Sequence, residues 1–546
     1  MINIAEKNRV IAIGLDSAEW RLIEKWMQEG HLPNLQSMMK RGLFSKVFGG
    51  KGYAAESPWT ACLTGCKPET TGYWSPAKIL ADYRVDEIGA YDYDGCRVFY
   101  DYCPDRKIIA FDVPHARVSD RMSGVQVLAW GAHSPQGPSE AQPPELFDAI
   151  NERFGTHPAL RKDDILVWET DTKTNQLEQD LITGIERRTE ACLHLMTEKD
   201  WDLTLVVYGE VHSAGHGFWH LSQQDHPLST IYGDAQSDAL LNVYKATDRA
   251  VGRFMDAAPD DAMVMVFSQE GMKTNSSDLP SWLFLPELLY RHSFDGRVAM
   301  AAADRDSGLP DYARLEETEW LRAIWALKAD DKPLRRLIRR HCKFRISQQL
   351  EKLWPDDPLS PAHPLDGDTY RYMPQMWYRR LWPRMKAFAL PSFSDGYVRI
   401  NLAGREQNGI IAPDRFDATL DEICGLLMDL KCARGGGPMV KELIRTRKTV
   451  PAPGEPCQPD ADLIIIWTDT PTNVIDSPQY GRVGPAPFRR TGDHYNQGFF
   501  LLNGPGIDGR EMPSGDLVDI APTILDLMGV PTPNHFDGRS RLRDAA

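Results

Sequence analysis

The sequence predicts a layered α/β fold in which helices cover both faces of a central sheet. Short apolar runs alternate with longer amphipathic runs through most of the chain, as in sheets with helices on both faces. The alternation stops between Met272 and Ser392, where the pattern is helical and no strand is clear. The length of 546 residues, 42% of them hydrophobic, allows a large core. We therefore expect an α/β core from residues 1–271 and 393–546, with an inserted, mainly helical cap at 272–392.

The first strand is expected at Val10–Leu15 and ends at Asp16. A helix follows near Glu19, and Ser17 is its expected N-cap. An aspartate at the carboxyl end of a first strand lies where open α/β sheets place ligand-binding groups. Helix capping explains Asp16 equally well.

A second helix is expected to begin at Pro58, with Ser57 or Glu56 as its cap, and to end at Thr64-Gly65. Its first N–H groups can hold an anion, which Glu56 would oppose. Further strands are expected at Lys107–Asp112, Val125–Leu128, Leu203–Tyr208, Met263–Phe267, Leu463–Trp467 and Phe499–Leu502. Further helices are expected at Pro144–Phe154, Gln176–Thr197, Asp234–Ala257, Asp414–Met428 and Asp519–Met528.

Acidic and imidazole side chains follow directly after one of these apolar runs. Glu210, His212 and His216 come after Leu203–Tyr208, in what we expect to be a loop, and His220 follows. Two histidines four residues apart can direct both imidazoles at one divalent metal. The alternative is that each is a partly buried histidine bonded to a carbonyl, but the clustering favours a metal.

The composition limits the partners. The net charge is −15 and no long basic run is present, so nucleic acid and anionic membranes are poor candidates. Neither a signal segment nor an apolar run long enough for a bilayer is seen, and we expect a cytoplasmic protein. The nine cysteines are scattered and are expected to be reduced packing thiols. The Arg- and Trp-rich runs of the cap are more typical of arginines stacked on aromatic rings than of an anion-binding surface.

Several segments, in a specific order and spacing, carry a resemblance over most of the chain. They are VIAIGLDSAEW, LPNLQSMMKRG, SPWTACLTGCKPETTGYW, GEVHSAGH, VFSQEGM, LPSFSDGYVRINLAGRE, GDHYNQGFFLLNGPGI and DLVDIAPTILDLMGVPTPNHFDGRS. With these segments the chain resembles the alkaline phosphatase superfamily, in the branch of type I phosphodiesterases and nucleotide pyrophosphatases. The resemblance implies an alkaline-phosphatase-like α/β/α sandwich.

The resemblance also implies a site of two adjacent metals, usually zinc, around a Ser or Thr nucleophile. Asp16 matches the first aspartate ligand. His212 and His216 match an Asp-x-x-x-His pair, with histidine in place of the aspartate, and His494 matches the late histidine of the same metal. Three imidazoles with an open fourth position would suit zinc.

At the second metal the sequence departs from the family pattern. Gln269 and Glu270 stand where family members have aspartate and histidine. Glu270 is still a candidate ligand that pairs with Asp16, in a site closer to what Mn or Mg accepts. We expect Glu56 to converge with these two carboxylates, so that they either bind a hard ion or share a proton near neutral pH. The alternative is that Glu56 points to solvent.

The nucleophile is not assigned by the resemblance. Without a gap, Ala55 falls on the nucleophile position, and shifts of one and two residues bring Glu56 and Ser57 there. The ungapped alignment is favoured because a gap would rotate the rest of the helix. Ser57 is therefore predicted to be a helix cap and not a covalent nucleophile.

We expect a metal-dependent hydrolase or transferase that acts on a phosphate, sulfate or phosphonate ester of a small molecule or nucleotide. Its nucleophile would be metal-activated water, with Glu56 or Glu270 as general base. Two alternatives remain open. One is a metalloenzyme that uses the scaffold for lysis or another group transfer, and the other is a catalytically silent metal-binding homologue.

Overall fold

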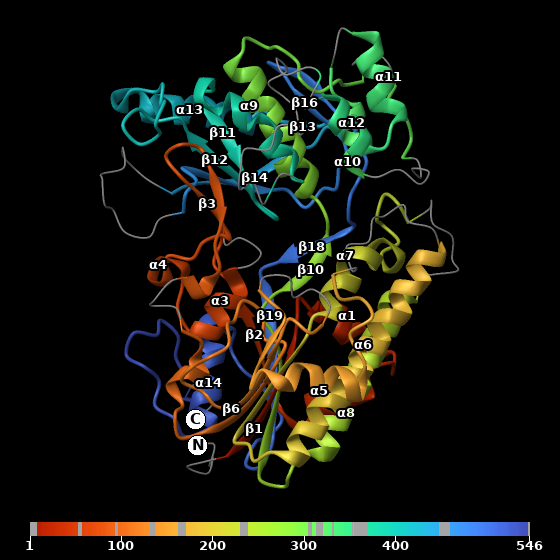
Figure 1. Ribbon diagram of the computed structural model, residues 1–546, viewed down its shortest axis with the longest axis vertical. Coiled ribbons are helices and arrows are strands. Elements are labelled where there is room, and N and C mark those ends of the chain that lie inside the picture. Colours follow the sequence, from red (N-terminus) through yellow and green to blue (C-terminus); the bar gives the residue numbers. More distant parts are fainter. Residues whose placement is uncertain are drawn as a thin grey trace.

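The computed structural model describes residues 8–52, 57–92, 97–131, 137–161, 171–229, 238–303, 308–312, 320–329, 332–351, 353, 370, 372–446 and 459–543. Within these ranges the chain forms a larger lower part and a smaller upper part (Figure 1). No helix in the described ranges is both long and apolar enough to cross a bilayer.

The lower part is built on a large mixed sheet with the described strand order β20-β2-β19-β9-β1-β8-β5-β6-β7, and β21 also pairs with β2. Its five central strands, from β9 to β6, run parallel, whereas β19 and β7 are antiparallel to their neighbours. The strands are β1 (Arg9–Leu15), β2 (Leu43–Phe48), β5 (Lys107–Phe111), β6 (Ser123–Leu128), β7 (Glu140–Gln142), β8 (Leu203–Tyr208), β9 (Ala262–Ser268), β19 (Gln497–Asn503), β20 (Arg510–Glu511) and β21 (Gly515–Asp516).

The two faces of this sheet bury separate cores because side chains alternate along each strand. In β1, Ile11 and Ile13 pack on one face, and Val10 and Ala12 pack on the other. The first face is covered by α1 (Trp20–Gln28), α2 (Pro33–Arg41), α5 (Glu145–Phe154), α6 (Asp171–Glu198), α7 (Glu210–Ser222) and α8 (Ala239–Ala257). The second face is covered by α3 (Ser57–Thr64), η2 (Phe99–Tyr102), η7 (Leu517–Asp519) and α14 (Ile520–Leu527). This arrangement confirms the predicted α/β/α sandwich.

The upper part contains strands as well as helices. Its helices are η4 (Pro280–Phe284), α9 (Leu285–Ser293), α10 (Trp320–Ala326), α11 (Pro333–His341), α12 (Phe344–Glu351), η5 (Pro374–Arg384), η6 (Pro413–Arg415) and α13 (Phe416–Met428). One sheet has the order β11-β12-β15-β14, and a smaller one has the order β13-β16-β17. These strands are β11 (Ala387–Leu390), β12 (Gly396–Ile400), β13 (Lys431–Cys432), β14 (Val440–Arg445), β15 (Leu463–Trp467), β16 (Ile475–Ser477) and β17 (Gly481–Val483).

The expected boundary of the cap at residue 393 is therefore too early. Strands β12 to β17 join the upper sheets and not the large sheet, because their apolar side chains share one core with α9 and η5. The hairpin of β3 (Ala77–Ile79) and β4 (Val85–Glu87) also packs on this upper core. As expected for a packed cap, Arg339 is buried and lies 4.9 Å above the ring of Trp325.

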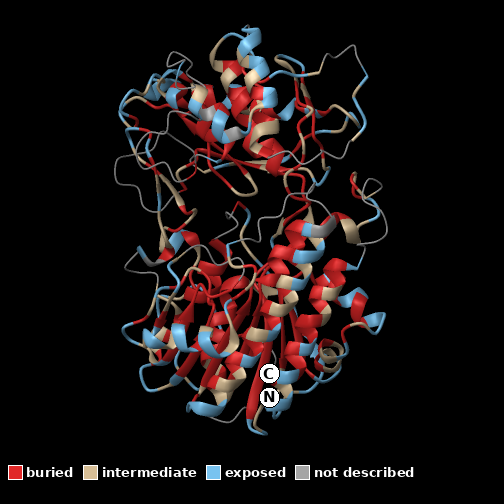
Figure 2. Cartoon of the chain, turned by 45° about the vertical axis from the view of Figure 1, so that its right-hand side comes forward, coloured by how far each residue is buried: buried red, intermediate tan, exposed pale blue. Residues whose placement is uncertain are grey.

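The segment that joins the two parts carries the site. Strands β10 (Gly271–Thr274) and β18 (Gly492–Tyr495) form an antiparallel pair between them (Figure 1). The chain enters the upper part through β10 and returns through β18. Buried residues extend from the centre of the large sheet to this junction (Figure 2).

Candidate metal centre

The candidate site lies at the carboxyl edge of three adjacent parallel strands. Strand β1 pairs with both β8 and β9, so the residues that follow these strands meet at one edge. Asp16 follows β1, the helix α7 follows β8, and Gln269 follows β9. Open α/β sheets bind ligands at such an edge.

His212 and His216 lie in the helix α7 and not in a loop, which corrects the sequence expectation. Helix α7 begins at Glu210, directly after β8. Residues four apart share one helix face, so both imidazoles point the same way. Val211 and Ala214 fill the apolar core behind them.

The outer nitrogens of these two imidazoles are bonded to acceptors. His212 Nδ1 lies 2.9 Å from Asp16 Oδ2, and His216 Nδ1 lies 2.8 Å from the carbonyl oxygen of Gly492. A carbonyl or carboxylate oxygen only accepts, so each Nδ1 carries hydrogen. The two Nε2 atoms then face each other at 2.7 Å. Two lone pairs at this distance repel unless a proton or a metal cation lies between them.

His494, in β18, completes the group. One ligand atom of each histidine lies within 4.8 Å of the others. Among the described residues, these three form the group that could hold a metal ion, called the metal-binding group below. Burial lowers the pKa of His216 well below its ordinary value, and the charge of Arg490 lowers it further. A lowered pKa favours the neutral imidazole, which is the form in which histidine binds a metal. The residues thus fit a divalent metal, and three imidazoles suit zinc.

Asp16 supports His212 from behind and is not in the histidine group. Its Oδ1 accepts from Trp59 Nε1 and from Gln269 Nε2, both at 2.7 Å, and its Oδ2 faces His212. A carboxylate on the second nitrogen of a ligand histidine fixes its orientation. Asp16, predicted as a ligand, takes this supporting position in the structure.

Glu270 contacts His494, the third histidine of the group. Its Oε1 lies 2.9 Å from His494 Nδ1. Burial lowers the pKa of His494, but the attraction to Glu270 outweighs it and raises this pKa to about 9. Asp16 and Glu270 both lie beside the Ser17 hydroxyl oxygen, at 3.2 and 3.1 Å. Glu56 and Ala55 lie outside the described residues, so the predicted cluster with Glu56 stays a prediction. Ser57 is the first described residue of α3 and is fully buried.

Ser17 is not the cap of α1, which corrects the sequence expectation. Glu19 caps the helix by accepting from the backbone N–H of Arg21. Ser17 has a φ of 53°, a left-handed conformation that is strained for a non-glycine residue. Its hydroxyl lies 3.2 Å from Asp16 Oδ1 and 3.1 Å from Glu270 Oε1. This backbone conformation places the Ser17 hydroxyl between the carboxylates of Asp16 and Glu270.

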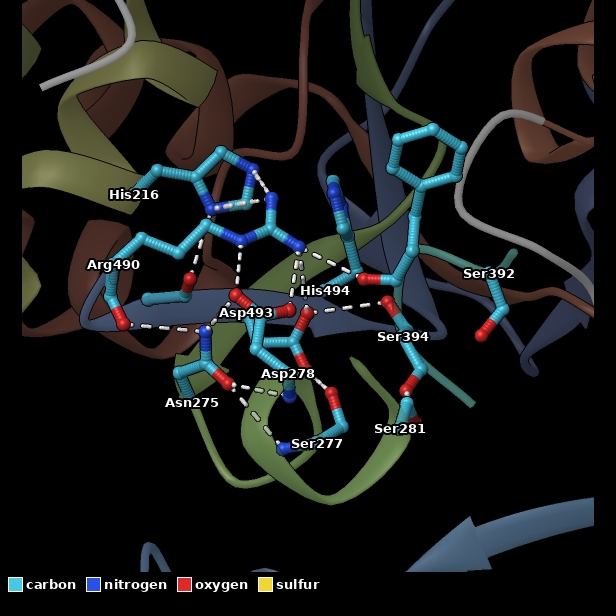
Figure 3. Close-up of polar contacts among 12 residues, drawn as sticks. His216, Asn275, Ser277, Asp278, Ser281, Ser392, Ser394, Arg490, Asp493 and His494 are labelled. Carbon is cyan, nitrogen blue, oxygen red and sulfur yellow. Dashed lines mark hydrogen bonds and ion pairs between the residues drawn. The ribbon is translucent and has the colours of Figure 1, made fainter. Parts of the chain in front are cut away.

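Arg490 is a site residue that the sequence analysis missed. Asp278 holds its guanidinium through two hydrogen bonds of 2.7 and 2.9 Å, and Phe393 accepts from it through its carbonyl oxygen at 2.8 Å. Its Nη1 lies 2.8 Å from His216 Nε2 (Figure 3). The one signal in the sequence was an arginine four residues before His494.

A buried ion cluster anchors the first turn of α7. Arg188 donates to both carboxylate oxygens of Glu210 and, at 2.7 Å, to Asp112 Oδ2. His157 Nε2 lies 2.9 Å from Glu210. All four side chains are buried. The sequence grouped Glu210 with the histidines. In the structure it instead anchors the start of α7, the helix that carries His212 and His216.

His220 is separate from the metal-binding group. Its Nδ1 lies 3.1 Å from the hydroxyl oxygen of Thr491. Burial, together with a smaller effect of the nearby His226, lowers the pKa of His220 to about 3. It is thus a neutral packing histidine one turn beyond His216.

The sequence of residues 10–317 matches the family model of type I phosphodiesterase / nucleotide pyrophosphatase. This match spans more than half of the chain. The protein belongs to this family. A stretch of 45 residues is also 53% identical to the extracellular sulfatase SULF-1 homolog of Drosophila melanogaster, and it covers 8% of this chain and 4% of that protein. The chain thus matches only a small part of that relative's length.

Solved structures of alkaline phosphatase relatives share the fold. A mutant of alkaline phosphatase PafA aligns over 99% of both chains, with a TM-score of 0.51 and 12% identity. The wild-type alkaline phosphatase PafA aligns over 100% of both chains, with a TM-score of 0.50 and 11% identity. The fold of this phosphodiesterase family member is therefore alkaline-phosphatase-like.

Proposed function

We propose that this protein is a metal-dependent hydrolase of small phosphate esters, with phosphodiesters as the first class to test. The observation that supports this most is the convergence of His212, His216 and His494, in a member of a phosphodiesterase family. A divalent ion bound there would polarise a phosphoryl oxygen and activate water.

The remaining roles in this proposal belong to residues of the chain. Asp16 and the carbonyl oxygen of Gly492 hold His212 and His216 in the tautomer that presents Nε2. Glu270, in contact with His494, is the candidate proton acceptor. Alanine at position 55, where the resemblance places a nucleophile, favours attack by water over a covalent intermediate.

Arg490 is proposed to bind the anionic group of the substrate. Asp278 orients the guanidinium so that Nη1 faces His216, beside the histidine group. A guanidinium suits the oxygens of a phosphate ester because it donates several hydrogen bonds in a fixed plane.

Hydrolysis assays test the proposed activity directly. The protein would be treated with chelator, reloaded with zinc or manganese, and assayed with nitrophenyl phosphate diesters, phosphate monoesters and sulfate esters. We expect diester turnover that is lost with the metal and returns with it. Turnover of sulfate esters alone, or no metal-dependent turnover of any ester, would contradict the proposal.

The Arg490→Met variant is expected to raise KM by roughly 10–100-fold, because a hydrogen bond to a charged group contributes about 1.5–3 kcal/mol. Metal content should not fall, since the guanidinium competes for the lone pair of His216 Nε2. Steady-state kinetics and elemental analysis measure the two effects. Arg489→Met is the matched control, because Arg489 and Arg490 lie over the same Trp282 ring, at 5.1 and 5.9 Å, whereas the contact with His216 Nε2 is made by Arg490. An unchanged KM in Arg490→Met would remove the assigned role.

A further inference from the structure

The resemblance places a second metal among Asp16, Gln269 and Glu270. In this structure an amide lies between the two carboxylates. Gln269 Nε2 lies 2.7 Å from Asp16 Oδ1 and 3.2 Å from Glu270 Oε1. All three side chains are buried.

The orientation of this amide is fixed by its other end. Gln269 Oε1 accepts from the backbone N–H of Ser17 at 3.4 Å. Rotating the amide by half a turn would place its oxygen between two carboxylates and its NH₂ group against an N–H donor. Both changes are unfavourable, so the donor end faces Asp16 and Glu270.

The lone pairs of Asp16 are already used. Trp59 and Gln269 donate to Oδ1, and the Ser17 hydroxyl also lies 3.2 Å from it. Oδ2 is bonded to His212. A carboxylate has about four lone-pair sites, so these contacts leave Asp16 little capacity to ligate a metal.

Glu270 is likewise supplied with donors. Gln269 Nε2 and His494 Nδ1 lie 3.2 and 2.9 Å from its Oε1. The one hydroxyl hydrogen of Ser17 can be donated either to this oxygen at 3.1 Å or to Asp16 Oδ1 at 3.2 Å. Neighbouring buried carboxylates repel unless a cation or hydrogen-bond donors lie between them. Here the amide, the hydroxyl and the imidazole meet that need without a second ion.

We propose that this protein binds one metal ion per chain, and that Gln269 and Ser17 take the place of the second ion of the family site. The inference rests on the proposed function only for the ion at the three histidines. It makes the protein a single-metal member of a family with two-metal sites.

Metal stoichiometry tests this inference. The untagged protein would be loaded with excess zinc plus manganese, desalted and measured by elemental analysis. One metal per chain is expected for the wild type. The Gln269→Glu variant keeps the shape of the side chain but brings three carboxylates together, which require a cation. We expect it to gain a second, hard ion such as manganese.

Glu270→Gln is the matched control. It replaces a carboxylate by an amide at the neighbouring position, which is the reverse of the exchange in Gln269→Glu. It should keep one metal and lose turnover by roughly 10²–10⁴-fold, as expected for a proton acceptor. Two metals bound to the wild type, or no gain in folded Gln269→Glu, would overturn the inference. One bound metal without ester hydrolysis would instead refute the proposed function and leave the stoichiometry intact.

Discussion

Replacement of His212 by alanine is expected to abolish metal-dependent ester hydrolysis and to remove most of the bound metal. Loss of a residue that only supports a ligand costs about 10–100-fold in metal affinity, and loss of a ligand should cost more. His212 Nε2 lies 2.7 Å from His216 Nε2, so the remaining pair cannot reproduce the three-histidine group. Isothermal titration with zinc measures the affinity, and the ester assay measures turnover.

His220→Ala is the matched control for this experiment. His220 lies in the same buried helix, but it is bonded to Thr491 and is outside the metal-binding group. We expect its metal affinity and turnover to stay close to the wild type. Full metal occupancy in His212→Ala would contradict this prediction, because it would show that other residues hold the ion.

Replacement of Arg188 by methionine is expected to lower the free energy of unfolding by about 3–5 kcal/mol. The arginine is fully buried and is shared by Glu210 and Asp112. Without it, two carboxylates remain buried without their cation. Urea unfolding, followed by circular dichroism, measures the change.

Arg249→Met provides the comparison for this loss of stability. Arg249 forms an exposed ion pair with Glu186 at 3.8 Å, and such pairs contribute only about 0–1 kcal/mol. The double variant Arg188→Met/Glu210→Gln should recover part of the lost stability, because it removes one of the stranded charges. Equal stabilities of Arg188→Met and Arg249→Met would contradict the role given to the buried cluster.

The sequence predicted those parts of the protein that depend on local pattern and family resemblance. Six strands of the large sheet follow from apolar runs such as Leu203–Tyr208, namely β1, β5, β6, β8, β9 and β19, whereas β2 and the short edge strands were not predicted. The three histidines follow from matched motifs. Their convergence was predicted although His212 and His494 are far apart in the chain, because the order of the motifs fixes the family fold. Asp16 and Glu270 were also predicted to meet, and the structure brings them together.

Other features depend on tertiary contacts that no local pattern reports. Helix α7 was expected to be a loop because it follows directly after the apolar run of a strand, yet packing around Val211 and Ala214 makes it a buried helix. Arg490 was missed because its partner Asp278 is remote in the sequence. The upper sheets were assigned to the core because a strand pattern does not say which sheet a strand joins.

The coordination of a zinc ion loaded into the protein decides whether His212, His216 and His494 form one metal centre. X-ray absorption at the zinc edge of the zinc-loaded protein would report the type and number of ligands. We expect three imidazole nitrogens, with zinc–nitrogen distances of about 2.0–2.1 Å, and one further light atom in the fourth position. A spectrum with sulfur ligands, or with fewer than three imidazoles, would contradict it.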